Sequence, residues 1–164
     1  MLPCVFAVLK PNKRANLDYL FLFAASFLSA TLLPFGSEAL LLYYANDESL
    51  SLVFLGCWAS MGNTLGGLTN WWLGRYLVRY EHKRWFPVNP SGRAKAARFF
   101  NRYGVYSLLF TWLPIVGDGI ALISGVLRTP LKYFLPLVFI GKAARYALVL
   151  WGQQVILLNG NLLP

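Results

Sequence analysis

Four long apolar segments divide the chain, and charged side chains are mostly confined to the stretches between them. Residues 19–37 and 49–74 are uncharged. The second segment has 26 residues, enough to cross a hydrocarbon core of about 30 Å as a helix rising about 1.5 Å per residue. Residues 103–127 contain one charge, and residues 131–158 carry Lys132 at their start and two more bases inside. This pattern predicts an all-α polytopic membrane protein with about two to three spanning helices.

Composition and charge placement narrow the class of protein. Only 13% of the 164 residues are charged, against about 25% in an ordinary soluble domain, and 57% are hydrophobic. These values exclude a disordered chain, a soluble basic nucleic-acid-binding domain and a water-soluble enzyme. The formal net charge is +9, and residues 75–102 contribute +7 of it, with eight Lys and Arg against Glu81. Such a stretch favours the cytoplasmic side of a membrane.

The basic stretch itself has helical periodicity. Lys95, Arg98 and Arg102 recur at three- and four-residue spacing, and apolar residues fall largely on the other side. We expect a basic amphipathic helix on the anionic cytoplasmic leaflet. A solvated loop helix without lipid contact is the alternative.

The chain also contains an internal repeat. TLLPFGSE (31–38) and TWLPIVGD (111–118) share Thr, Leu, Pro and a carboxylate at an offset of 80 residues. Downstream, Gly62 corresponds to Gly141. We therefore expect a single membrane domain over residues 1–164, with repeat 1 at about 17–76, a basic linker at 77–103 and repeat 2 at about 104–158.

Each repeat is broken by proline and glycine. Proline removes a backbone donor and clashes with the preceding turn, and glycine permits a sharp reversal. Irregular backbone persists at membrane depth only when it is buried in protein or faces water. The breaks at Pro34 and Gly36, and at Pro114 and Gly117, therefore predict two re-entrant hairpins that meet near the membrane midplane. The alternative is two spanning helices that are merely kinked.

Four ionisable residues lie inside apolar segments, and their charges cancel. They are Glu38, Asp118, Lys142 and Arg145. An unpaired charge in the membrane core is costly, so we expect these groups to converge in a substrate and proton site. There the bases would meet an anionic headgroup and the carboxylates would take up protons. Alternatively, Lys142 and Arg145 snorkel to an interface and residues 146–163 span the membrane alone.

Gly62, Gly66 and Thr69/Asn70 form a stripe of small residues on the second segment, which predicts close helix packing. The expected packing positions are Gly62, Gly66, Gly67 and Gly74. The sequence shows no metal cluster, no phosphate-binding loop and no Ser/His/Asp arrangement. We therefore expect no metal, no cofactor and no enzymatic activity.

Four ordered motifs resemble the bacterial DedA family, which shares the domain of SNARE-associated Golgi proteins, and most of all its short YqaA-like branch. The motifs are FLSATLLPFGSEALL (27–41), MGNTLGGLTNWWLGRY (61–76), LPIVGD (113–118) and GKAARY (141–146). The resemblance implies an inner-membrane protein with inverted repeats and two re-entrant hairpins. It also implies a role in lipid translocation, such as flipping of undecaprenyl phosphate or scrambling of phospholipids, which in some members depends on the proton-motive force.

The same resemblance assigns the family's acidic residue after the first break to Glu38. The main family pattern flanks the second proline with two arginines, but here those positions hold Thr111 and Gly117, and Asp118 follows. Lys142 and Arg145 are the candidates to supply the missing positive charge.

We expect a flippase-like transporter that moves an anionic lipid or similar amphiphile across the bacterial inner membrane, with protons as candidate coupling ions. Nucleic acid is not an expected partner, and homo-oligomerisation stays open. The alternative is a non-transporting membrane scaffold or interaction protein. The side of the N-terminus is also open. Inverted repeats place Lys10, Lys13 and Arg14 outside, whereas a fully crossing first segment places the N-terminus inside.

Overall fold

A computed structural model describes residues 13–31, 36–77, 98, 100, 102–114 and 116–160, and every regular element in these ranges is helical. The elements are α1 (Lys13–Thr31), α2 (Gly36–Tyr44), α3 (Leu52–Leu77), the 3-10 helix η3 (Gly104–Trp112), α5 (Val116–Val126) and α6 (Leu131–Gly160). Pro34, Lys95 and most of the expected linker at 77–103 lie outside the described residues.

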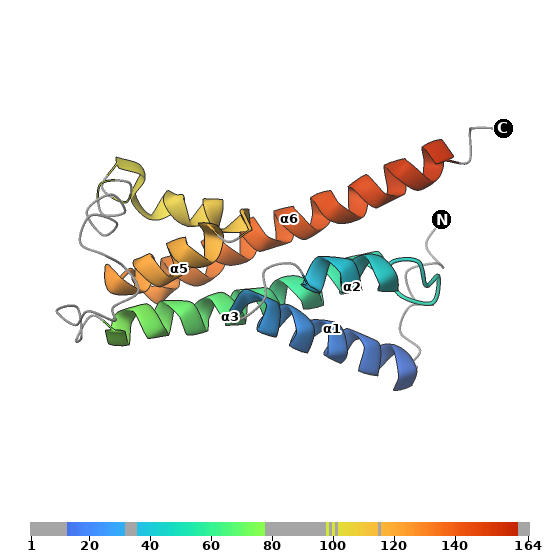
Figure 1. Cartoon of the computed structure of the whole chain (residues 1–164), viewed down its shortest axis with the longest axis horizontal. Helices are drawn as coiled ribbons and strands as arrows, with labels where there is room; N and C mark the ends of the chain where they lie inside the picture. The colour runs from blue at the N-terminus through green and yellow to red at the C-terminus, as the bar shows by residue number, and fades with distance from the viewer. Residues whose placement is uncertain are drawn as a thin grey trace.

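Two long helices form the axis of the molecule. α3 and α6 lie side by side and run in opposite directions (Figure 1). α1 and α2 form a hairpin at the end where α3 begins, and η3 and α5 form a second hairpin at the end where α3 finishes (Figure 1). In both hairpins the first helix ends, and the second begins, near the middle of the molecule.

The two halves of the chain use the same order of elements. Each consists of a helix, a proline-containing break, a short helix, a turn and a long helix. α1 packs on α3, and the corresponding η3 packs on α6. The antiparallel long helices and the opposed hairpins agree with an inverted repeat, whose symmetry in the membrane stays a prediction.

The apolar core is divided between the two ends of the molecule. The first cluster joins α1, α2, α3 and α6 and contains Leu22, Leu41, Leu50, Leu55, Ala59, Tyr146 and Leu150. The second joins α3, η3, α5 and α6 and contains Trp71, Leu108, Ala121, Phe134 and Val138. Lys142 and Arg145 come between the positions that α6 contributes to these two clusters.

One described helix is long and apolar enough to cross a membrane. It is α6, over Leu131–Leu158, with a mean hydropathy of 1.5. α3 has 26 residues, but its glycine, serine, threonine and asparagine residues lower its hydropathy. We expected two to three spanning helices. Among the described residues, one helix meets the criteria of length and composition for such a span.

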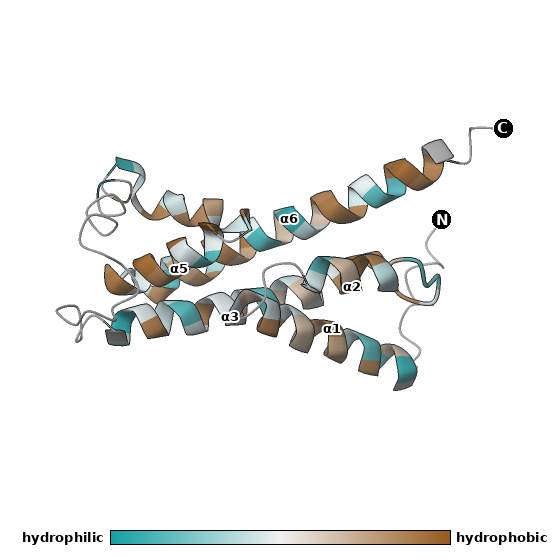
Figure 2. Cartoon of the chain, viewed as in Figure 1, coloured by the Kyte–Doolittle hydropathy of each residue, from teal (hydrophilic) through white to brown (hydrophobic). Residues whose placement is uncertain are grey.

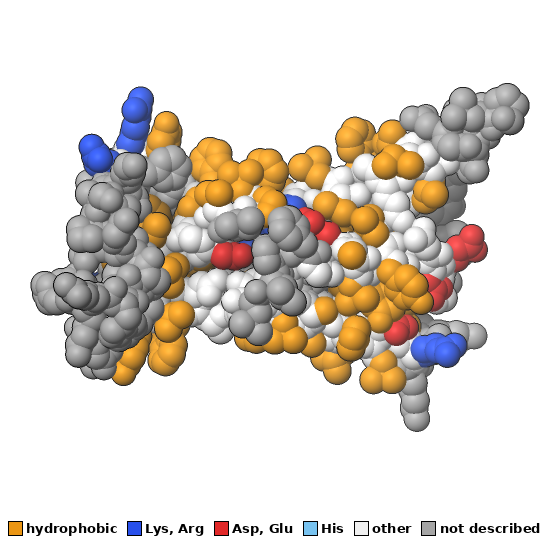
Figure 3. Space-filling view, viewed as in Figure 1, with side chains coloured by type: hydrophobic (Ala, Val, Ile, Leu, Met, Phe, Trp, Pro, Cys, Tyr) orange, Lys and Arg blue, Asp and Glu red, His pale blue; other side chains and the backbone are white. Residues whose placement is uncertain are grey.

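The surface is unusually apolar for a folded chain. Exposed large side chains include Phe21, Val53, Trp72, Ile140 and Trp151. Figure 3 shows such side chains along the flanks of the molecule, and Figure 2 shows hydrophilic residues at both ends and again near the middle of α6. An apolar surface of this extent is typical of a chain that contacts lipid.

Candidate functional site

The two carboxylates occupy equivalent places in the two hairpins. Glu38 is the third residue of α2, and Asp118 is the third residue of α5, so each lies in the first turn of a short helix. Unpaired backbone N–H groups and the helix dipole stabilise a negative charge at this position. The proline breaks therefore place both carboxylates at helix N-termini near the middle of the molecule.

Both bases come from α6, and each pairs with a different carboxylate. Arg145 Nε donates to Glu38 Oε1 at 2.6 Å, and the same guanidinium makes an ion pair with that oxygen through Nη2. Lys142 Nζ donates to Asp118 Oδ1 at 3.2 Å. One α6 turn thus contacts the N-terminal ends of both α2 and α5.

Burial differs between the two members of each pair. The side chains of Lys142 and Arg145 are 3% and 9% exposed, whereas those of Asp118 and Glu38 are 25% and 26% exposed. Acidic side chains are visible near the middle of the face in Figure 3, with basic atoms beside them. The bases are therefore enclosed, and each carboxylate has an open side through which a proton or a ligand could approach.

This geometry disagrees with the interpretation that the two bases snorkel to a membrane interface. Snorkelling keeps the charged head in water, and both side chains are buried and paired instead. The use of these four groups as a substrate and proton site stays a prediction.

A hydrogen-bonded chain of neutral groups lies beside the Glu38–Arg145 pair. Asn63 Nδ2 donates to the Tyr146 hydroxyl at 2.8 Å, and that hydroxyl lies 3.0 Å from Ser37 Oγ. Ser37 Oγ in turn donates to Ser29 Oγ at 3.3 Å. Either hydroxyl can be the donor in the contact between Tyr146 and Ser37. Four helices are joined through one buried tyrosine.

These neutral residues were not identified by sequence reasoning. The sequence nevertheless contains a pattern that could have indicated two of them, Asn63 and Tyr146. When Gly62 is aligned with Gly141, Asn63 falls opposite Lys142, and Tyr146 follows Arg145 directly in the GKAARY motif. Both positions are polar residues in apolar segments.

Glycines bring the helices into close contact around the site. A Cβ at Gly62 would collide with the carbonyl oxygen of Phe23 in α1, and a Cβ at Gly66 would lie 2.7 Å from that of Phe27. A Cβ at Gly74 would collide with the carbonyl oxygen of Leu122 in α5. By contrast, a Cβ at Gly67 would meet only Val138 Cγ1, at 3.7 Å.

The second repeat shows the corresponding contact. A Cβ at Gly141 in α6 would lie 2.8 Å from the Leu109 carbonyl oxygen in η3. Gly117, at the second break, is buried, and a Cβ there would collide with the backbone of Thr111. Gly36, at the first break, has open space around it. Pro114 is exposed between η3 and α5.

The described part of the basic stretch lies away from these groups. Arg98 and Arg102 are helical and exposed, and the segment that leads from them into η3 lies near the end of the molecule where α3 finishes (Figure 1). Their contact with a leaflet stays a prediction. In the described residues no group of three or more His, Cys, Asp or Glu could hold a metal ion.

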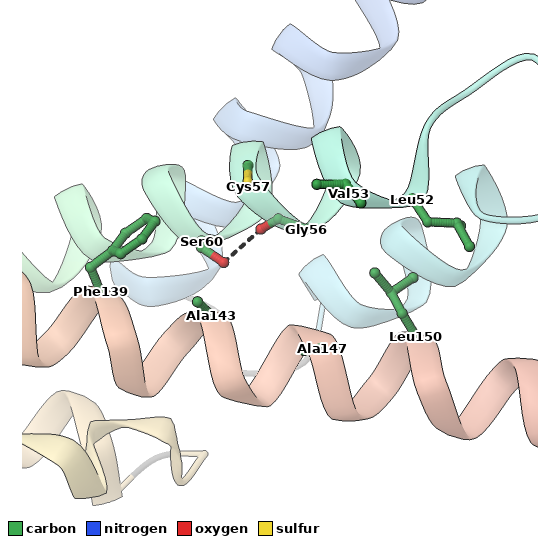
Figure 4. Close-up of a pocket in the computed structure, with 9 residues that line it drawn as sticks. All are labelled: Leu52, Val53, Gly56, Cys57, Ser60, Phe139, Ala143, Ala147 and Leu150. Carbon is green, nitrogen blue, oxygen red and sulfur yellow. Dashed lines mark hydrogen bonds between the residues drawn. The ribbon is translucent and has the colours of Figure 1, made fainter. Parts of the chain in front are cut away.

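An apolar hollow of about 330 Å³ lies between α3 and α6. Figure 4 shows it lined by small and aliphatic residues and by the ring of Phe139, with Ser60 Oγ turned back to donate to the Gly56 carbonyl oxygen at 2.6 Å. Its α6 wall includes Ala143 and Ala147, which follow Lys142 and Tyr146 directly. α6 therefore turns Ala143 and Ala147 toward this hollow and Lys142, Arg145 and Tyr146 toward the hairpins.

Comparison with known proteins gives consistent matches over most of the chain. The VTT domain matches residues 35–153, a range that includes all four charged residues of the site. Inner membrane protein YqaA of Escherichia coli (strain K12) is 43% identical over 131 residues, which cover 78% of this chain and 85% of that protein. An uncharacterised protein of Haemophilus influenzae is 33% identical over 148 residues, which cover 84% and 88%. No solved structure gives a significant match.

These matches and the apolar surface together assign the chain to the bacterial inner membrane.

Proposed function

Because the chain belongs to the VTT-domain family, also called the DedA family, we propose that it moves an anionic lipid or a similar amphiphile across the inner membrane. The observation that carries this proposal is the pair of buried bases on α6, each held by a partly exposed carboxylate at a helix N-terminus.

The chemistry of the pairs suggests how such a site could work. An anionic headgroup needs a base, and in the resting arrangement both bases are occupied by carboxylates. When Glu38 takes up a proton, Arg145 loses its counter-ion and can bind a phosphate oxygen instead. The charge of the site stays balanced, which matters because an uncompensated buried charge is strongly unfavourable. Proton uptake and headgroup binding are thereby coupled.

The apolar flanks support an amphiphile as cargo. A lipid's acyl chains can stay in the surrounding hydrocarbon while its headgroup passes the charged site. The alternative function, a scaffold that associates through glycine stripes, receives less support. Gly62 and Gly66 already contact α1, and Gly74 contacts α5 of the same chain.

The proposal is tested by lipid translocation in liposomes. The purified protein is reconstituted in vesicles of phosphatidylethanolamine and phosphatidylglycerol that contain a fluorescent phosphatidylglycerol. Loss of fluorescence on addition of an impermeant quencher then reports movement between leaflets. We expect Glu38→Gln to slow this movement at least about tenfold, the factor that corresponds to 1.4 kcal/mol.

Two further variants make the result interpretable. Glu38→Gln/Arg145→Gln removes both charges and leaves an amide pair, so it tests the site without an unpaired buried base, and it should also lose translocation. Glu48→Gln neutralises an exposed acid in the turn between α2 and α3 and should keep the wild-type rate. A folded double variant that moves lipid at the wild-type rate would rule out this site.

A further inference from the structure

Helix α2 is held in place differently from the other helices of the site. It buries only Ser37 and Leu41, and Gly36 at its start has open space around it. The equivalent helix α5 is held by backbone approaches, in which Gly125 meets the Trp71 carbonyl group and Gly74 meets that of Leu122. α5 therefore interlocks with α3, whereas α2 depends on side-chain contacts.

α2 makes polar contacts to α6 at both of its ends, in addition to contacts of Ser37 with Ser29 and of Tyr44 with Asp18 in α1. At its first turn, Ser37 is bonded to Tyr146 and Glu38 to Arg145, so two consecutive residues contact two consecutive residues. At its far end, Gln153 Nε2 donates to the Leu42 carbonyl oxygen at 3.4 Å and to Asn46 Oδ1, just past the helix, at 2.9 Å. α2 is thus fastened to α6 at both ends.

Tyr146 is the central residue of this arrangement. It has no exposed surface, and its hydroxyl is shared between Ser37 of α2 and Asn63 of α3. At the equivalent position of the second hairpin, Gly117 has no side chain to make such a contact. The asymmetry sets the first hairpin apart within an otherwise repeated architecture.

We propose that Tyr146 is a positioning residue that holds α2, and with it the Glu38 carboxylate, against α6, and that α2 is the movable element of the site. Hydrogen bonds weaken steeply with distance and angle, so a small displacement of α2 releases all of them. Helices that pack backbone to backbone at a glycine are not separated by such a small displacement. Once Glu38 is protonated, Tyr146 and Gln153 supply the remaining polar contacts between α6 and α2 in the described residues. The inference rests on the proposed function in one respect only, which is that the movement of α2 takes part in lipid transport.

The movement can be measured without any transport assay. In a background of Cys4→Ser and Cys57→Ser, a single cysteine replaces Leu41 of α2, and the rate of labelling by a membrane-permeant maleimide is followed in liposomes. Leu22→Cys in α1 is the matched control, because both leucines have 0% exposure and belong to the same apolar cluster. Adding Tyr146→Phe should raise labelling of Leu41→Cys about fivefold, as expected when a hydrogen bond of typical strength is lost, and should leave Leu22→Cys unchanged.

Gln153→Ala removes the hydrogen bonds between α6 and the other end of α2. Its side chain is only partly buried, so folding is retained, and labelling of Leu41→Cys should again rise while that of Leu22→Cys does not. Unchanged labelling of Leu41→Cys in both variants would overturn the proposal. An equal rise at both positions would also overturn it, since Tyr146 would then act only as a core residue. Because labelling needs no lipid movement, a wild-type protein without translocation activity would refute the proposed function and leave this result standing.

Discussion

At the scale of single residues, the acid and the base of each ion pair differ in burial. Lys142 and Arg145 are almost fully enclosed, and each depends on one carboxylate for its counter-charge. The carboxylates are about a quarter exposed and can be stabilised in part by their surroundings. The two members of a pair should therefore contribute differently to stability.

This inequality leads to a prediction for the Glu38–Arg145 pair. Glu38→Gln leaves a buried guanidinium without a counter-ion and should lower the free energy of unfolding by about 3–5 kcal/mol. Arg145→Gln leaves only a partly exposed carboxylate and should cost about 1–2 kcal/mol. Thermal unfolding in detergent measures both values. The double variant should recover most of the loss, and equal losses in the two single variants would contradict the argument.

At the scale of elements, glycine position decides which helices approach closely. Three glycines of α3 serve two partners, since Gly62 and Gly66 contact α1 and Gly74 contacts α5. Between them, Asn70 Nδ2 donates to the Ala30 carbonyl oxygen at 2.9 Å. α3 is therefore the common support of both hairpins.

Alanine substitutions on α3 should separate close contacts from ordinary ones. Gly74→Ala introduces a methyl group where the Leu122 carbonyl oxygen lies, and it should lower stability by about 1–3 kcal/mol. Gly67→Ala meets only Val138 Cγ1 at 3.7 Å, and the better helix propensity of alanine should make it neutral or stabilising by up to about 1 kcal/mol. Unfolding temperatures of the two variants would be compared, and a similar loss in both would contradict the assigned contacts.

At the scale of the whole molecule, charge separates along the long axis. Most exposed bases of the described residues gather at the end where α3 finishes. The acidic turn between α2 and α3 lies at the opposite end, together with Arg14 at the start of α1 (Figures 1 and 3). Arg102, Arg128 and Lys132 belong to the basic end, and Asp47 and Glu48 to the acidic end. The positive-inside rule then predicts that the basic end faces the cytoplasm.

The orientation of α1 follows from the same arrangement. α1 begins at the acidic end, which favours a first segment that enters and returns over one that crosses (Figure 1). In a cysteine-free background, Asn16→Cys and Glu48→Cys should both react with an impermeant maleimide in intact cells, and Arg128→Cys should react only after permeabilisation. Labelling of positions 16 and 48 from different sides would show that the first segment crosses.

Much of the candidate site could be predicted from the sequence, because its signals are local. Proline and glycine interrupt a helix wherever they occur, and a charge within an apolar segment stands out without knowledge of the fold. For this reason the two breaks, the repeat and the four charged residues follow from the residues alone. The sequence also indicated the family, through motifs spread over both repeats.

Only the tertiary structure decided which groups meet. Lys142 and Arg145 lie on one helix, and nothing in their spacing says that Arg145 pairs with Glu38 and Lys142 with Asp118. The contact of Tyr146 with Ser37 joins residues 109 positions apart, and it depends on how α2 lies against α6. The unequal burial of acid and base has the same origin. Pairing and burial are set by the relative placement of whole helices, which packing determines and local sequence does not.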